Sequence, residues 1–239
     1  MAMLGCLEHV ASAVCSQATL HVVVPAFAHF KSGLHLPTLL QALGVGALSA
    51  YARANAGWLE QLYGKGLNAL AMQSGEACES AVCHRISFMY ALLYRHSQLN
   101  LATRETLDEM FGIANLDAFD HLARMVQAGR LVDRQGHDVY LPAINRLAIP
   151  ITFLRGADNG CFLTRGSELS FELLRVSNPG VPYARHVIPD YGHIDCIFGK
   201  NAAADVYPHV LAHFGWQCER LRRRRGLSGL PGGGEPLLG

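Results

Sequence analysis

A strand–helix–strand–helix order in the second half of this 239-residue chain places the strongest constraint on its fold. Residues 149–154 form a short, continuous apolar run, which is typical of a strand buried on both faces of a parallel sheet. A second strand is predicted at 183–188, and helices are predicted at 167–176 and 203–214. Strands that alternate with helices in this way imply a parallel sheet with helical crossovers. The sequence therefore predicts an α/β fold.

The first half of the chain is predicted to hold one further strand and a large helical insertion. Residues 13–25 are rich in β-branched side chains and end in proline, which indicates a buried strand that leads into a loop. Residues 1–9 are expected to form a short helix. From about 34 to 129 the apolar residues recur at helical spacing, and this insertion between two strands is typical of a helical cap. A small hairpin is predicted at 131–140.

Composition excludes several classes of protein and sets the expected domain boundary. Half of the residues are hydrophobic and 16% are charged, which excludes a disordered chain. The net charge is only +1, and five arginines are gathered between Arg220 and Arg225, so the rest of the chain has no electrostatic reason to bind nucleic acid. We expect one folded domain over 1–218 and a disordered tail over 219–239, rich first in arginine and then in glycine and proline.

Targeting segments, membrane spans and metal sites are not expected. No uncharged run of about 18 apolar residues exists, so no membrane span is predicted. The apolar N-terminus has no basic segment and is soon interrupted by Glu8 and His9, which argues against a signal peptide and leaves the cytoplasm as the default location. The seven cysteines are scattered, and Cys78, Cys83 and His84 lack a fourth metal ligand at regular spacing.

Two candidate catalytic residues follow the two predicted strands of the second half. Asp158 comes just after the strand at 149–154, and His193 comes just after the strand at 183–188. In parallel α/β sheets, functional residues collect at the carboxyl ends of strands. Histidine is suited to shuttling a proton near neutral pH, and a carboxylate holds its tautomer and stabilises the imidazolium. An acid followed by a histidine is the downstream half of a hydrolase triad.

The segment around this histidine also carries a family resemblance. Residues 192–199, Gly-His-Ile-Asp-Cys-Ile-Phe-Gly, resemble the histidine motif of the acid-lipase-like branch of the α/β hydrolases. The chain is still more similar to the hydrolase module fused behind cholesterol-oxidase-like flavoenzymes of the glucose–methanol–choline (GMC) oxidoreductase type. In that module similar stretches flank the motif, and here they are Val82–Tyr90, His186–Pro189 and Asp205–Pro208. The resemblance runs from Met1 to about Phe214 and implies lipase- or esterase-like action on an ester of a lipid or steroid.

The resemblance makes His193 the triad histidine and leaves the acid open. In many hydrolases the acid stands three residues after the glycine that ends the strand, and here that place holds Asn159. Asp158, one residue earlier, is the predicted acid if the loop register is shifted; as a turn residue it would instead cap the next helix. Asp195, within the motif, is the runner-up, although that position more often supports the local turn.

A nucleophile is missing from the sequence. The family order is nucleophile, acid and then histidine, with the nucleophile on a G-x-S-x-G-like elbow, and no such elbow is present. Ser12 and Ser16 lie within or beside the strand predicted at 13–25. Three cysteines near strand ends are expected to be buried instead of reactive: Cys15, Cys161 and Cys196. The resemblance implies that the chain begins just after the missing serine.

Taken with the resemblance, these observations predict an incomplete α/β-hydrolase fold, with the C-terminal parallel strands and a large helical cap, that is inactive on its own. The alternative is a non-catalytic truncated product or an interaction module. No cofactor is expected in this chain, because Gly44-Val45-Gly46 follows a helix and lacks the third glycine of a dinucleotide loop. FAD is expected only in an upstream oxidoreductase module. The expected partner of a complete hydrolase is a lipid or steroid ester.

Overall fold

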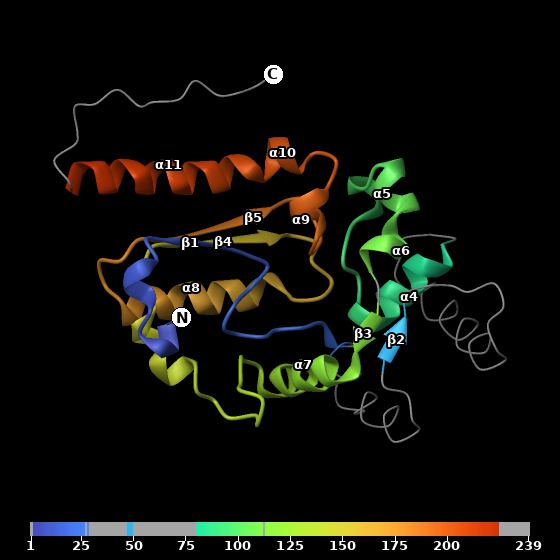
Figure 1. Ribbon diagram of the computed structural model, residues 1–239, viewed down its shortest axis with the longest axis horizontal. Helices are drawn as coiled ribbons and strands as arrows, with labels where there is room; N and C mark the ends of the chain where they lie inside the picture. Colours follow the sequence, from blue (N-terminus) through green and yellow to red (C-terminus); the bar gives the residue numbers. More distant parts are fainter. Residues whose placement is uncertain (1, 27, 29–46, 50–79, 112, 225–239) are drawn as a thin grey trace.

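The computed structural model describes residues 2–26, 28, 47–49, 80–111 and 113–224 (Figure 1). Its central sheet has three parallel strands in the order β1-β4-β5. They are β1 (Ala13–Ser16), β4 (Ile151–Gly156) and β5 (Tyr183–Ile188). Ala13 lies opposite Ile151, and Ile151 lies opposite Tyr183, so the carboxyl ends of all three strands meet at one edge of the sheet. The predicted parallel α/β arrangement is confirmed.

Helices cover both faces of this sheet. Figure 1 shows α8 (Thr164–Ser177) on one side of the strands and α10 (Ala202–Asp205) with α11 (Tyr207–Arg224) on the other. Helix α8 follows β4 along the chain and precedes β5, so it forms the helical crossover that two parallel strands require. The predicted helices at 167–176 and 203–214 correspond to α8 and to the α10–α11 pair, with longer bounds.

Each face of the sheet has its own apolar cluster, because successive side chains of a strand point to opposite faces. Every residue of β4 is buried, as its continuous apolar run predicts. Ile151 and Phe153 pack with Leu174 of α8, while Leu154 packs with residues of the α10–α11 side, among them Ala202 and Val206. Packing on both faces holds β4 in place, and the candidate functional site lies in the loops at the strand ends.

The described part of the region between β1 and β4 combines helices with long loops. It contains α4 (Ala81–Tyr90), α5 (Leu101–Glu105), α6 (Leu107–Met110) and α7 (Leu116–Ala128). A small antiparallel pair, β2 (Ala47–Ser49) with β3 (Ile113–Asn115), interrupts the helices, which the helical pattern did not predict. Much of the cap expected at 34–129 lies outside the described residues, as does Gly44-Val45-Gly46.

Several local predictions differ from the structure. The first strand ends at Ser16 and does not continue to residue 25, because Gln17 adopts a left-handed backbone with φ of 59°. Where a short helix was expected over 1–9, the described residues 2–9 hold two short 3-10 helices, Ala2–Leu4 and Leu7–His9. The prediction of a hairpin at 131–140 was wrong. This segment is a turn without strands, in which the Asp133 carboxylate accepts hydrogen bonds from the backbone of Gln135 and His137.

The C-terminal helix passes the boundary expected at residue 218. Helix α11 continues to Arg224, and the Arg220 guanidinium lies 5.5 Å from the centre of the Trp216 ring. Residues 225–239 lie outside the described part, so a disordered tail there stays a prediction. None of the described helices is long and apolar enough to span a membrane.

Candidate functional site

Three loops meet where the parallel strands end, and each brings a polar side chain to the same place. Gln17 follows β1, Asn159 lies in the loop after β4, and His193 lies in the loop after β5. The Asn159 side-chain nitrogen, Nδ2, donates to Gln17 Oε1 at 2.8 Å. The same nitrogen lies 3.0 Å from Nδ1 of His193. The three side chains therefore form a continuous hydrogen-bonded chain along the carboxyl edge of the sheet.

His193 is held in place by the segment that follows α4. The backbone N–H groups of His193 and Ile194 both donate to the Leu93 carbonyl, at 2.8 and 2.9 Å. The imidazole is half-buried, and its centre lies 5.6 Å from the centre of the Phe162 ring. Burial, followed by the positive charge of Arg155, lowers the pKa of His193 to about 4. The ring is therefore neutral at physiological pH.

Asn159 contacts the histidine at the position where the family resemblance expects an acid. The residue is only 3% exposed. Its Oδ1 accepts hydrogen bonds from the backbone N–H groups of Cys161 and Phe162, at 2.9 and 3.0 Å. Its Nδ2 faces Gln17 and His193. A neutral amide, instead of a carboxylate, is thus the group that contacts the imidazole.

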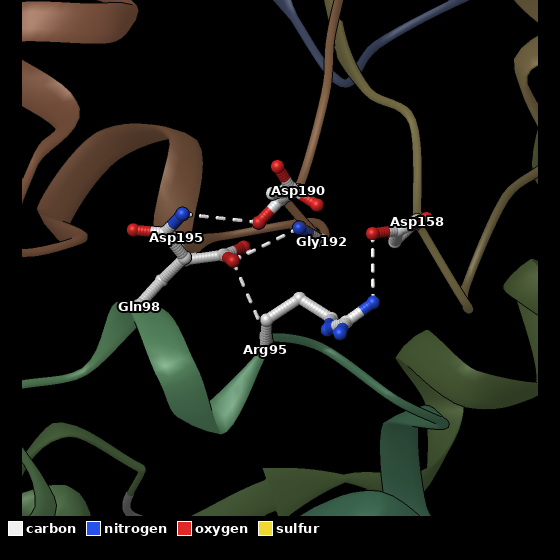
Figure 2. Close-up of polar contacts among 6 residues, drawn as sticks. All are labelled: Arg95, Gln98, Asp158, Asp190, Gly192 and Asp195. Atoms are coloured by element: carbon white, nitrogen blue, oxygen red, sulfur yellow. Dashed lines mark hydrogen bonds and ion pairs between the residues drawn. The ribbon is translucent and has the colours of Figure 1, made fainter.

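Asp158, the predicted acid, makes its side-chain contact elsewhere. Its Oδ2 forms an ion pair with Nη1 of Arg95 at 2.7 Å, as Figure 2 shows, and both side chains are more than a third exposed. Among the described residues, no hydrogen bond joins Asp158 to His193. The structure therefore brings Asn159 and His193 together and does not bring Asp158 into that contact. A catalytic role for Asp158 stays a prediction.

Asp195 supports the loop that carries His193. Its carboxylate is fully buried, and Oδ2 accepts hydrogen bonds from the backbone N–H groups of Gly192, at 2.9 Å, and Arg95, at 3.2 Å (Figure 2). Nearby, Gln98 Nε2 donates to the Asp190 carbonyl at 3.1 Å. Hydrogen bonds of the Asp195 carboxylate and the Gln98 amide thus join residues 95–98 to the loop after β5.

Two glycines allow the loops to approach closely. A Cβ atom at Gly156 would lie 2.0 Å from the Gly192 carbonyl oxygen and 2.3 Å from that of Tyr191. A Cβ atom at Gly192 would lie 3.0 Å from both Asp195 Oδ1 and the Tyr94 Cα atom. The absence of a side chain at Gly156 therefore lets the loop after β5 pack directly against the end of β4.

Two residues of this site were not singled out from the sequence. Gln17 is buried and lies at the strand end, but the predicted strand continued through it to residue 25. Arg155, at 1% exposure, donates from Nη1 to the Gln17 carbonyl at 2.7 Å. Burial, and then the charge of Arg185, lowers the pKa of Arg155 to about 10. The sequence signal that could have identified Arg155 is its charge within a strand that is otherwise mostly apolar.

The described residues supply no activated nucleophile to His193. Asn159 is the only one of them that hydrogen-bonds to the imidazole. Ser16 Oγ is buried and has no hydrogen-bond partner among the described residues. Burial, followed by the Asp195 charge, raises the pKa of the buried Cys196 thiol to about 12, and burial also raises the pKa of Cys15. These thiols are protonated at neutral pH, and thiolates are the reactive form.

The cysteine and histidine side chains near α4 form hydrogen bonds to one another. Cys83 Sγ lies 2.8 Å from the Tyr94 hydroxyl and 3.0 Å from Nε2 of His96. Cys78 lies outside the described residues, as does the His84 side chain. In the described ranges no group of three or more histidine, cysteine or acidic side chains is arranged to hold a metal ion.

Comparison with solved structures finds likeness to hydrolases. An alpha/beta hydrolase fold protein from Chitinophaga pinensis is 14% identical, with a TM-score of 0.39, over 92% of this chain and 60% of that chain. E-2-(Acetamidomethylene)succinate hydrolase is 16% identical, with a TM-score of 0.31, over 87% of this chain and 57% of that chain. An alpha/beta hydrolase enzyme from a Medee basin deep-sea metagenome library is 16% identical, with a TM-score of 0.35, over 89% of this chain and 69% of that chain.

The chain spans about 60% of the length of the Chitinophaga protein that it resembles. No model of a known protein family matches the sequence. No curated protein matches it either.

Proposed function

We propose that this chain is an α/β-hydrolase-type domain that binds an ester of a lipid or steroid beside His193 and does not hydrolyse it on its own. The contact between Asn159 and the His193 ring is the observation that carries this proposal. It supports descent from a hydrolase, because a histidine and its partner stand at adjacent strand ends. It also supports loss of turnover, because the partner is an amide.

The chemistry of ester cleavage explains why an amide partner argues against turnover. In a serine–histidine–acid triad, the histidine takes the proton of the nucleophile, and the carboxylate stabilises the imidazolium that forms. The Asn159 amide carries no negative charge with which to do this. Burial and the Arg155 charge further disfavour the protonated ring. His193 is therefore poorly suited to act as a general base, and no described serine or cysteine hydrogen-bonds to it.

The apolar residues beside the His193 ring favour an apolar ligand. Phe162, which lies against the His193 ring, and the neighbouring residue Ile194 both pack on one hydrophobic cluster. The buried members of that cluster come from α4 and the segments after it, together with one residue from the loop after β4: Cys83, Ile86, Leu93, Tyr94, Leu99, Leu107 and Cys161. An apolar wall with a few placed polar groups is the usual make-up of a small-molecule site. The resemblance to the hydrolase module of cholesterol-oxidase-like proteins makes a lipid or steroid ester the proposed ligand class.

The same resemblance suggests a wider context. We propose that relatives of this chain function next to a GMC-type oxidoreductase, and that FAD belongs to that separate module and not to the described site. No cofactor is part of the function proposed for this chain.

Two assays on the purified chain test the proposal. First, 4-nitrophenyl acetate and 4-nitrophenyl octanoate are offered as substrates, and we expect no rate above the buffer blank. Second, binding of cholesteryl acetate in detergent micelles is measured by NMR titration, with His193→Gln as the test variant and the exposed His9→Gln as its control. We expect at least about tenfold weaker binding for the first variant only. Ester cleavage lost in His193→Ala, or equal binding by both variants, contradicts the proposal.

A further inference from the structure

The orientation of the Asn159 amide is set by four hydrogen bonds. Its oxygen accepts from two backbone N–H groups, those of Cys161 and Phe162. Its nitrogen has two hydrogens, and it faces Gln17 Oε1 at 2.8 Å and His193 Nδ1 at 3.0 Å. Rotating the amide by half a turn would place its NH₂ group against the two backbone donors. The network therefore identifies which atom is nitrogen and which is oxygen.

This orientation determines where the proton of His193 resides. A neutral imidazole carries one hydrogen, so one ring nitrogen donates and the other accepts. Because Asn159 offers an N–H group to Nδ1, Nδ1 must accept, and the hydrogen must lie on Nε2. A triad histidine has the opposite form, in which Nδ1 donates to the acid and Nε2 accepts the proton of the nucleophile.

We propose that Gln17 and Asn159 are positioning residues that hold His193 as its Nε2–H tautomer, so that the ring donates a hydrogen bond to an acceptor atom of the bound molecule. The ligand chemistry that matches a neutral N–H donor beside an apolar cluster is a carbonyl oxygen, such as that of an ester. The identity of the ligand rests on the function proposed above, whereas the tautomer follows from the contacts of the free protein.

The backbone of Gln17, directly after β1, places its side chain for this role. Its backbone takes the left-handed conformation, with φ of 59°, which residues other than glycine rarely adopt. Two contacts hold that turn: the Gln17 N–H donates to the Leu154 carbonyl at 2.9 Å, and Arg155 Nη1 donates to the Gln17 carbonyl at 2.7 Å. The turn brings Gln17 Oε1 to the second hydrogen of the Asn159 amide, which leaves the first hydrogen for His193.

The electrostatic surroundings favour the same neutral form. Burial and the Arg155 charge both act against protonation of the ring. Nε2, on the other side of the half-buried ring from the Asn159 contact, makes no hydrogen bond to any described residue. An N–H group at that position therefore has no acceptor among the described residues of the free protein.

The decisive experiment measures the tautomer directly in the unmodified chain. Two-bond ¹H–¹⁵N correlation NMR distinguishes a protonated ring nitrogen from an unprotonated one, and the signals of His193 are assigned by their loss in His193→Gln. Between pH 6 and 8 we expect an unprotonated Nδ1 and a protonated Nε2, with an excess of roughly tenfold over the other tautomer. A protonated Nδ1 overturns the inference.

A pair of variants then tests Gln17. Gln17→Met keeps the length of the side chain and removes the acceptor, so we expect the tautomer excess to fall several-fold as Asn159 is less firmly held. Gln17→Glu keeps an acceptor oxygen and is expected to retain the excess of the unmodified chain. An unchanged tautomer ratio in Gln17→Met overturns the positioning role of Gln17.

The outcomes separate this inference from the proposed function. The tautomer is measured without any ligand, so cholesteryl acetate binding with a protonated Nδ1 refutes the inference and retains the function. An Nε2–H ring in a protein that does not bind the ester refutes the function and retains the positioning role of Gln17 and Asn159.

Discussion

Asn159 places its side-chain nitrogen 3.0 Å from Nδ1 of His193. The two residues come from the loops after β4 and β5, so this contact is produced by two neighbouring parallel strands that end at the same edge. A hydrolase triad uses such a contact to join an acid to its histidine. Here the same geometry joins two neutral groups, and in the inference proposed above it prepares His193 to donate a hydrogen bond instead of relaying a proton.

Replacing Asn159 by aspartate is expected to raise the pKa of His193. A carboxylate next to the ring favours the imidazolium, typically by about 1–3 pKa units. The value should therefore rise from about 4 towards or beyond 6, and the protonated ring should become detectable at mildly acidic pH. NMR titration of the ring protons from pH 3 to 8 measures the change. Asp158→Asn is the control, because Asp158 pairs with Arg95 and should leave the titration within a few tenths of a unit.

The sequence predicted the strand-end framework well because burial leaves a clear pattern. The apolar run at 149–154 and the strand at 183–188 correspond to β4 and β5, and the loops after them carry Asn159 and His193. The loop register after β4 was the uncertain step. Residues 158 and 159 are both short and polar, and only the three-dimensional contacts distinguish the exposed one from the buried one.

Gln17 and Arg155 were harder to predict because tertiary contacts decide their roles. A run of β-branched residues after Gln17 suggests an unbroken strand, yet the left-handed turn at Gln17 ends it, and the bond from Arg155 to the Gln17 carbonyl is a long-range contact. The hairpin at 131–140 failed for a related reason. The Asp133 side chain satisfies the backbone N–H groups of the turn, so a local loop replaces the expected strand pair.

The folded chain is expected to lose stability as the pH falls from about 6.5 to 4. In that range the unfolded chain protonates His193, whose ordinary pKa is 6.5, while the folded chain keeps it neutral down to about 4. The free energy of unfolding should decrease through this window by on the order of 3 kcal/mol and level off below it. Burial lowers the pKa of His186 and His213 as well, so they add to the slope in the same direction.

Urea denaturation at a series of pH values measures this effect. His193→Gln removes the titrating group at similar size, so its unfolding free energy should depend less steeply on pH between 6.5 and 4. A variant as pH-dependent as the unmodified chain shows that another group controls acid stability.

Truncating the two candidate acids should have unequal effects on stability. Asp195→Ala leaves the buried backbone N–H of Gly192 and that of Arg95 without their acceptor, which should cost at least about 2 kcal/mol. Asp158→Ala removes only a partly exposed ion pair with Arg95, a contribution of about 0–1 kcal/mol. Chemical denaturation of both variants measures the difference. Equal losses would mean that Asp195 does not hold the loop as the contacts indicate.

Alanine is expected to be far more harmful at Gly156 than at Gly215. At Gly156 the new Cβ atom would lie 2.0 Å from the Gly192 carbonyl oxygen, so either β4 or the loop that carries His193 must move. We expect a loss of roughly 3 kcal/mol in unfolding free energy, together with shifted NMR signals of the His193 ring. Gly215 lies in the exposed part of α11 with open space around it, and alanine there should stabilise the helix by up to about 1 kcal/mol. If Gly156→Ala is as stable as the unmodified chain and leaves the His193 ring signals unchanged, then the two loops do not pack as closely as these contacts require.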